Sequence, residues 1–207
     1  MEIQILATMV FTLFLIVDPI ALIPLLPEMT KDNTVKEKKI MIRRAILVAF
    51  LVLMFFTLLG RILLGYFGVS IAAVRIAGGI LLFGIGIEML YGRVTKTEST
   101  EKEHEEAIEK KDVSITPIAI PLLAGPGAIA TVMMYSSIYP TITGVSMIVL
   151  SLLLVMIASW ILLITAEKIG ERLGGIGVKV IARVMGLLLV FSATQIFIEG
   201  LKLAGFI

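Results

Sequence analysis

The sequence predicts an all-α integral membrane protein with six transmembrane helices, arranged as two inverted three-helix repeats in which helices 1 and 4 are discontinuous. Three observations predict this fold class. The first is composition, because 58% of the 207 residues are hydrophobic and 16% are charged, whereas soluble domains average roughly 45–50% and 25%. The second is a series of apolar stretches of membrane-spanning length. The third is an internal sequence repeat.

Six apolar stretches are long enough to cross a bilayer, which requires about 20 mostly apolar residues. The predicted spans cover residues 3–27, 45–66, 70–91, 115–139, 145–166 and 181–203. Their short connections leave no room for a large domain outside the membrane. The chain therefore divides into a first three-helix repeat at 1–92, a charged linker at 93–112 and a second three-helix repeat at 113–207.

The basic residues predict the orientation of these spans. Fifteen of the 18 Lys and Arg residues lie in or beside the connections after the first, third and fifth spans. Loops rich in Lys and Arg remain in the cytoplasm. We therefore expect a multi-pass cell-membrane protein with the linker 93–112 in the cytoplasm and both termini outside.

The two halves of the chain share sequence. Arg, Gly, Leu and Phe recur at an offset of 108 residues between the third span, at Arg75, Gly78, Leu81 and Phe83, and the sixth span, at Arg183, Gly186, Leu189 and Phe191. Pro19 and Ala21 of the first span likewise match Pro126 and Ala128 of the fourth. Because each half has an odd number of spans, the halves have opposite orientations. Inverted repeats of this kind are common in secondary transporters, which bind substrate at the repeat interface.

The first and fourth spans each contain a helix-breaking sequence near the middle, at Asp18-Pro19 and at Gly125-Pro126-Gly127. Proline removes a backbone donor and clashes with the preceding turn, so we expect both helices to unwind and restart there. Free amides at the restarts bind carboxylates, and unwound carbonyls accept from an ammonium group. The sequence therefore predicts a site for a small zwitterion. Its candidate substrate-binding residues are Asp18, Pro19, Ile20, Ala21, Gly125, Pro126, Gly127, Ala128, Thr131 and Gln195.

Asp18 is the only carboxylate deep within a predicted span, where an ionised side chain costs about 2.5–3.5 kcal/mol on insertion scales. Its carboxylate can cap the following half-helix, bind a substrate ammonium group or a cation, or carry a coupling proton. The sequence leaves these three roles open.

Four further charged residues lie near the ends of the third and sixth spans: Arg75, Glu88, Arg183 and Glu199. Interfacial placement, with long side chains extending to the headgroups, accounts for all four without a function. The alternative is a gating or charge network in which the arginines pair with carboxylates or guard the two entrances.

In these motifs the chain resembles the MarC/SnatA family of multi-pass membrane proteins. The resemblance rests on Asp-Pro-Ile-Ala-Leu-Ile-Pro at 18–24, Ile-Pro-Leu-Leu-Ala-Gly-Pro-Gly at 120–127 and Arg-Val-Met-Gly at 183–186, and it covers essentially the whole chain. It implies a plasma-membrane protein of prokaryotes. Some members of the family are described as transporters of small neutral amino acids such as glycine and alanine. The family often has Gly-Asn where this chain has Ala21-Leu22, so one polar side chain is missing here.

We therefore expect a secondary transporter of small neutral amino acids that works by alternating access in the lipid bilayer, with a proton or sodium ion as coupling partner. The alternatives are an ion channel or ion exchanger, or a membrane-organising protein without a transport substrate. We expect no enzyme, metal, cofactor or nucleic-acid partner, because the chain has no Cys and a single histidine, His104, in the charged linker. The sequence does not specify the oligomeric state or the direction of transport.

Overall fold

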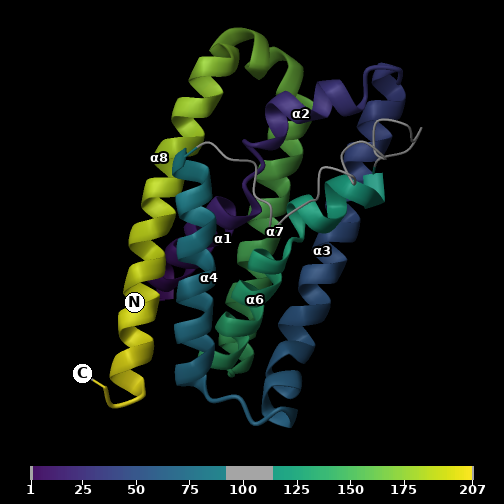
Figure 1. Cartoon of the computed structure of the whole chain (residues 1–207). Helices are drawn as coiled ribbons and strands as arrows, with labels where there is room; N and C mark the ends of the chain where they lie inside the picture. Colours follow the sequence, from purple (N-terminus) through teal and green to yellow (C-terminus); the bar gives the residue numbers. More distant parts are fainter. Residues whose placement is uncertain (1, 92–113, 207) are drawn as a thin grey trace.

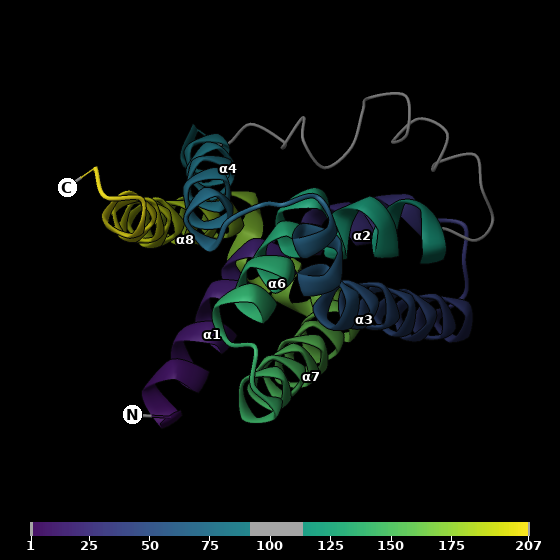
Figure 2. The ribbon, with the colours of Figure 1, turned by 90° about the horizontal axis from the view of Figure 1, so that it is seen from below.

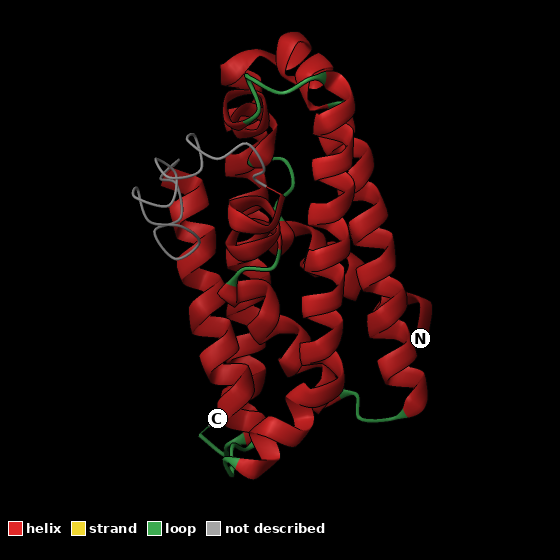
Figure 3. Ribbon diagram, turned by 90° about the vertical axis from the view of Figure 1, so that its right-hand side faces the viewer, coloured by secondary structure: helices red, strands yellow, loops and turns green. Residues whose placement is uncertain are grey.

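A computed structural model of the chain describes residues 2–91 and 114–206, and these residues form helices and no strand (Figures 1 and 3). The helices are α1 (Glu2–Val17), α2 (Leu22–Met29), α3 (Val35–Tyr66), α4 (Ile71–Tyr91), the π-helix η1 (Ser114–Leu123), α6 (Pro126–Ile138), α7 (Ile142–Ile164) and α8 (Ala166–Leu203). The predicted charged linker, 93–112, lies outside the described residues.

Four of these helices, α3, α4, α7 and α8, are long and apolar enough to cross a membrane, and α1 is a shorter apolar helix of 16 residues. The outer face of α3 has the character expected of a surface in lipid. Leu47, Leu51, Phe55 and Leu58 recur on that face, and each is more than half exposed. Soluble proteins rarely expose an apolar surface of this extent. The fold is therefore that of an all-helical membrane protein.

The N-terminus of α3 is defined by a capping box. The Thr34 hydroxyl accepts a hydrogen bond from the Glu37 amide at 3.3 Å, and the Glu37 carboxylate accepts one from the Thr34 amide at 2.7 Å. These two bonds satisfy amides that the first helical turn leaves free. The helix therefore begins at Val35, in the basic connection, and not at residue 45 where the apolar stretch begins.

The longest helix, α8, also begins before its apolar stretch, and it bends at Gly174 (φ 64°). Glycine adopts a positive φ without the steric cost that a Cβ would add. The bend separates a short charged segment, 166–173, from the long segment that follows, and Figure 1 shows α8 turning over at the upper end of the molecule.

Two of the three basic connections meet at this upper end. The Nζ atom of Lys38, in the first turns of α3, lies 2.6 Å from Oε1 of Glu167 at the start of α8. We call residues 31–44 and 166–179 the basic end of the bundle. The opposite end, where the α3–α4 connection and the end of α8 lie (Figure 1), is called the C-terminal end (residues 61–75 and 195–206).

The core forms where helices from both halves of the chain pack together. In the view from below (Figure 2), α4 and α8 lie side by side, and α6 lies between this pair and α3. Leu13 of α1, Leu53 of α3, Val132 of α6 and Leu152 of α7 are completely buried. The ends of α1 and α6 that carry the helix-breaking residues lie beside this core.

Candidate functional site

The chain leaves helical geometry between α1 and α2, in a turn that begins at Asp18. Asp18 has φ 40°, a left-handed conformation that Asp tolerates better than most residues. Its carboxylate oxygen Oδ1 accepts a hydrogen bond from the Ala21 amide at 3.3 Å. The side chain thus caps the turn that leads into α2. Free amides were expected at this restart, but the Ala21 amide is not free, because it donates to Asp18.

Burial makes this turn chemically unusual. Asp18 is only 9% exposed, and its neighbours Val17 and Pro19 are buried. Pro19 has no amide hydrogen to donate to the carboxylate. Within the described residues, the Asp18 carboxylate accepts the hydrogen bond from the Ala21 amide. An acidic side chain held among apolar residues in a membrane protein is a default candidate for function.

A second interruption lies between η1 and α6. The Ala124 amide still donates to the Ala119 carbonyl at 2.9 Å, but Gly125 is extended (φ −73°, ψ 170°). Helix α6 then begins at Pro126, whose ring suits the first helical position. The first intrahelical donor is the Ile129 amide, which donates to the Gly125 carbonyl at 3.0 Å. The amides of Gly127 and Ala128 precede it, and the helix itself offers them no acceptor.

The two interruptions approach each other through Gly127. A Cβ atom at this position would lie 3.4 Å from Cγ2 of Ile16, which is two residues before Asp18. It would also lie 2.5 Å from Cδ1 of Ile85 on α4. A larger residue at this position would therefore touch Ile16 of α1 and would require the end of the Ile85 side chain of α4 to move. The residues predicted at the two breaks, Asp18–Ala21 and Gly125–Ala128, therefore belong to one region of the structure.

A line of polar groups continues from Gly127 along α6. The buried Thr131 hydroxyl donates to the Gly127 carbonyl at 2.8 Å, so it serves its own helix in this conformation. One turn further, the Tyr135 hydroxyl is hydrogen-bonded to Thr12 of α1. Sequence reasoning did not select Thr12 and Tyr135 as site residues. The four-residue spacing of Gly127, Thr131 and Tyr135 was the signal that could have identified the tyrosine.

Gln195 is not brought to the two interruptions but to the charged residues at the C-terminal end. Its Nε2 atom donates to Oε1 of Glu199 at 3.2 Å, and the guanidinium of Arg75 donates to Oε2 of the same carboxylate. Arg75 and Glu199 therefore form an ion pair between α4 and α8. Of the other two candidate residues, Glu88 is half-buried and Arg183 is exposed.

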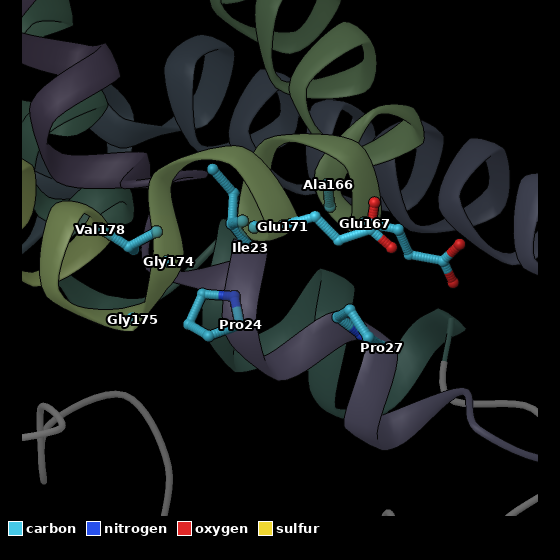
Figure 4. A pocket seen from close by; sticks show the side chains of 10 residues that line it. Ile23, Pro24, Pro27, Ala166, Glu167, Glu171, Gly174, Gly175 and Val178 are labelled. Atoms are coloured by element: carbon cyan, nitrogen blue, oxygen red, sulfur yellow. The ribbon is translucent and has the colours of Figure 1, made fainter.

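A groove of about 380 Å³ lies at the basic end, between α2 and the first part of α8 (Figure 4). Its lining residues are Ile23, Pro24, Pro27, Ala166, Glu167, Gly170, Glu171, Gly174, Gly175 and Val178. The sequence did not predict this groove, because its two walls are about 140 residues apart in the chain. In residues 2–91 and 114–206, no group of three His, Asp or Glu side chains is arranged to hold a metal ion.

These features define the class of the protein, an all-helical integral membrane protein with several apolar helices. The chain belongs to the MarC family, whose model, described as MarC family integral membrane protein, matches residues 3–204. No solved structure is significantly similar to the chain.

Curated relatives share most of the length of the chain. A UPF0056 membrane protein of Methanocaldococcus jannaschii is 38% identical over 92% of this chain and 83% of its own. One from Pyrococcus horikoshii is 37% identical over 92% of this chain and 90% of its own. The UPF0056 membrane protein YvbG of Bacillus subtilis is 34% identical over 92% of this chain and 91% of its own. These names specify membrane proteins and no substrate.

Proposed function

We propose that this protein is a secondary transporter of small neutral amino acids, of the glycine and alanine class, and that the substrate binds between two discontinuous transmembrane helices. In this proposal α1 and α2 form the first of six spans, and η1 and α6 form the fourth. The observation that carries the proposal is the packing of α1 against α6, with Gly127 placed so that a Cβ atom on it would lie 3.4 Å from Cγ2 of Ile16. An interrupted helix near the midplane is how transporters of this class present backbone groups to a solute.

Reciprocal packing supports the inverted repeat on which the proposal depends. Helix α3 of the first half packs against η1 and α6 of the second half, and α7 of the second half packs against α1 and α2 of the first. The remaining equivalent pairs, α3 with α7 and α4 with α8, pack against each other. A pseudo-two-fold axis that exchanges 1–92 with 113–207 produces these pairings.

The chemistry of the two interruptions matches a zwitterion. The amides of Gly127 and Ala128 lie at a helix N-terminus, where partial positive charge favours a carboxylate. The Asp18 carboxylate, at the other interruption, would attract an ammonium group. Glycine at 125 and 127 and alanine at 21 and 128 add little side-chain volume, so the solute must be small to approach the backbone. Glycine and alanine meet these three requirements.

Orientation and coupling complete the proposal. The meeting of basic connections at one end, through Lys38 and Glu167, supports a cytoplasmic basic end with both termini outside. The buried carboxylate of Asp18 is the group through which a proton or a sodium ion would couple to transport. Residues 1–92 and 113–207 would then rock against each other around the site.

Uptake of labelled glycine and alanine into proteoliposomes, with imposed proton or sodium gradients, tests this function directly. Counterflow distinguishes a transporter from a channel, because a channel does not exchange labelled for unlabelled substrate. We expect Gly127→Leu and Pro19→Ala to abolish uptake. Gly84→Leu is the matched control, because a Cβ at Gly84 meets no atom within 4 Å. Wild-type uptake by both site variants contradicts the proposed site, and absence of uptake and counterflow in the wild type contradicts the function.

A further inference from the structure

The face of α6 that begins at the proposed site carries polar groups toward the C-terminal end. Gly127, Thr131 and Tyr135 are four residues apart, so they lie on one face of the helix. Thr131 and Tyr135 are buried, with exposed fractions of 1% and 7%. The Tyr135 hydroxyl is hydrogen-bonded to Thr12 of α1. Polar groups therefore follow this face of α6 from Gly127 to Tyr135, toward the C-terminal end.

An ion pair joins α4 and α8 at the C-terminal end. The Arg75 guanidinium of α4 donates to the Glu199 carboxylate of α8, and Gln195 donates to the other carboxylate oxygen at 3.2 Å. Gly200 permits the close approach of the two helices here, because a Cβ on it would lie 3.1 Å from Cβ of Arg75. The pair joins a helix of residues 1–92 to a helix of residues 113–207. Any motion that separates the two halves at this end must break it.

One hydrogen-bond donor of the Arg75–Glu199 pair has no acceptor in residues 2–91 and 114–206. The Nε atom of Arg75 is buried and has no acceptor among the described residues. A buried donor without an acceptor loses its hydration without compensation, so an open arrangement with a hydrated guanidinium regains part of that free energy. Separation of Arg75 from Glu199 would therefore cost less free energy than separation of a fully hydrogen-bonded ion pair.

The opposite end of the molecule differs. There the groove between α2 and α8 separates the same two halves, and its walls include Ile23, five residues after Asp18 (Figure 4). Gly174 and Gly175 lie in this wall, and a Cβ on either would meet no atom within 4 Å. Both ends of the molecule therefore have an ion pair between the two halves, Lys38 with Glu167 at the basic end and Arg75 with Glu199 at the C-terminal end, and the basic end also has the groove.

We propose that Arg75 and Glu199 form a gate at the C-terminal end, and that Tyr135 lies beneath it on the path to the interrupted helices. The inference rests on the proposed transport function. In this proposal, the path opens from the basic end while the gate is closed. When the two halves rock, the ion pair separates and the path opens at the C-terminal end.

The absence of cysteine from the chain makes accessibility the sharpest test. A single reporter, Thr131→Cys, is exposed to a membrane-impermeant thiol reagent in spheroplasts, which present the C-terminal end, and in inverted vesicles, which present the basic end. Phe206→Cys, at the exposed chain end, reports which side of the membrane each preparation presents. With the pair intact, we expect the reporter to react faster in inverted vesicles.

Neutralising the pair should reverse this preference. We expect Glu199→Gln and Arg75→Gln each to accelerate labelling in spheroplasts by about tenfold or more, the size of a modest population shift. The charge-swapped double variant, Arg75→Glu with Glu199→Arg, should restore slow labelling. Arg61→Gln is the control, because it removes an exposed positive charge at the same end.

Equal labelling of the intact and neutralised pairs in spheroplasts overturns the gate, as does a charge swap that folds but labels as fast as the single variants. The two neutralising variants break the pair from opposite sides, so one remains informative if the other does not give a monodisperse protein. The measurement uses no substrate. A failure of amino acid uptake therefore contradicts the proposed function without deciding the gate, and a failure of the labelling pattern contradicts the gate alone.

Discussion

Gly86 of α4 and Gly186 of α8 face each other so closely that a Cβ atom on either would lie within 2.9 Å of the other's carbonyl oxygen. Their helices come from opposite halves of the chain. In a bilayer the lipid is as apolar as the side chains, so close packing of backbones is a main source of helix association. The two glycines therefore hold the first and second halves of the protein together.

The first prediction concerns this seam. We expect Gly86→Leu to destabilise the protein by about 1–3 kcal/mol or more, because the added side chain must push α8 away. Gly84→Leu, on the same helix, should have little effect because its Cβ meets nothing within 4 Å. Thermal unfolding in detergent, followed by size-exclusion chromatography, measures both. Equal melting temperatures for the two variants would contradict the packing described.

Asp18 allows its capping role to be separated from its charge. Asn tolerates a positive φ and retains an acceptor for the Ala21 amide, so Asp18→Asn should melt close to the wild type. Asp18→Ala loses that acceptor, and we expect a loss of stability of about 0.5–2 kcal/mol. Melting curves of the two purified variants measure both changes in stability.

If the charge binds the substrate ammonium group, Asp18→Asn should also weaken substrate binding about 10-fold to 100-fold, as expected for loss of a charge-assisted hydrogen bond. Uptake at a series of glycine concentrations measures this. Unchanged uptake by a stable Asp18→Asn protein would reduce Asp18 to a helix cap.

Gly127 offers a rescue experiment. In Gly127→Ala the new methyl group would lie 2.5 Å from Cδ1 of Ile85, which is the end of a side chain that can rotate away, so we expect a destabilisation of about 1 kcal/mol, at the low end of overpacking costs. Ile85→Val removes that atom, so the double variant should recover most of the stability. Because a methyl group still covers the amide that the proposed substrate must approach, uptake should remain impaired. A double variant that regains both properties would show that Gly127 serves packing alone.

The capping box of α3 gives a prediction far from the proposed site. Thr34→Ala removes the acceptor for the Glu37 amide, and we expect a loss of about 1 kcal/mol. Thr34→Ser keeps a hydroxyl and should behave as the wild type. Transport by both variants should be unchanged, since Thr34 is exposed and lies in the connection between α2 and α3. Loss of uptake in a stable Thr34→Ala protein would assign this end a role in transport.

Several parts of the structure could be anticipated from local sequence. The third predicted span, 70–91, agrees with α4 (Ile71–Tyr91), and the fifth, 145–166, overlaps α7 (Ile142–Ile164). The ends of helices were harder to predict where polar groups, and not hydrophobicity, determine them. The apolar stretch at 45–66 does not reveal that α3 starts at Val35, because a capping box and not hydrophobicity defines that end. The apolar stretch at 181–203 likewise does not reveal that α8 starts at Ala166, because the first turns of α8 are charged.

The candidate site shows the same division. Prolines and glycines marked the positions where α1 ends and α6 begins, because these residues act on the backbone locally. Thr12 and Tyr135 were not selected, since their contact depends on how α1 crosses α6. Gln195 was grouped with the site, and its hydrogen bond to Glu199 instead places it with the ion pair at the C-terminal end.

By itself, the sequence determined that this chain enters a membrane as apolar helices, and it predicted that the basic connections share one end, where the structure describes two of the three. Both properties depend on the composition of stretches of about 20 residues, because hydrophobicity and flanking positive charge determine how such a stretch inserts into a bilayer. Only the tertiary structure decided that Gly86 meets Gly186, that Arg75 pairs with Glu199 and that Gly127 lies close to Ile16. Those contacts depend on the rotation and crossing of helices, which hydrophobicity does not specify because lipid and neighbouring helices are equally apolar.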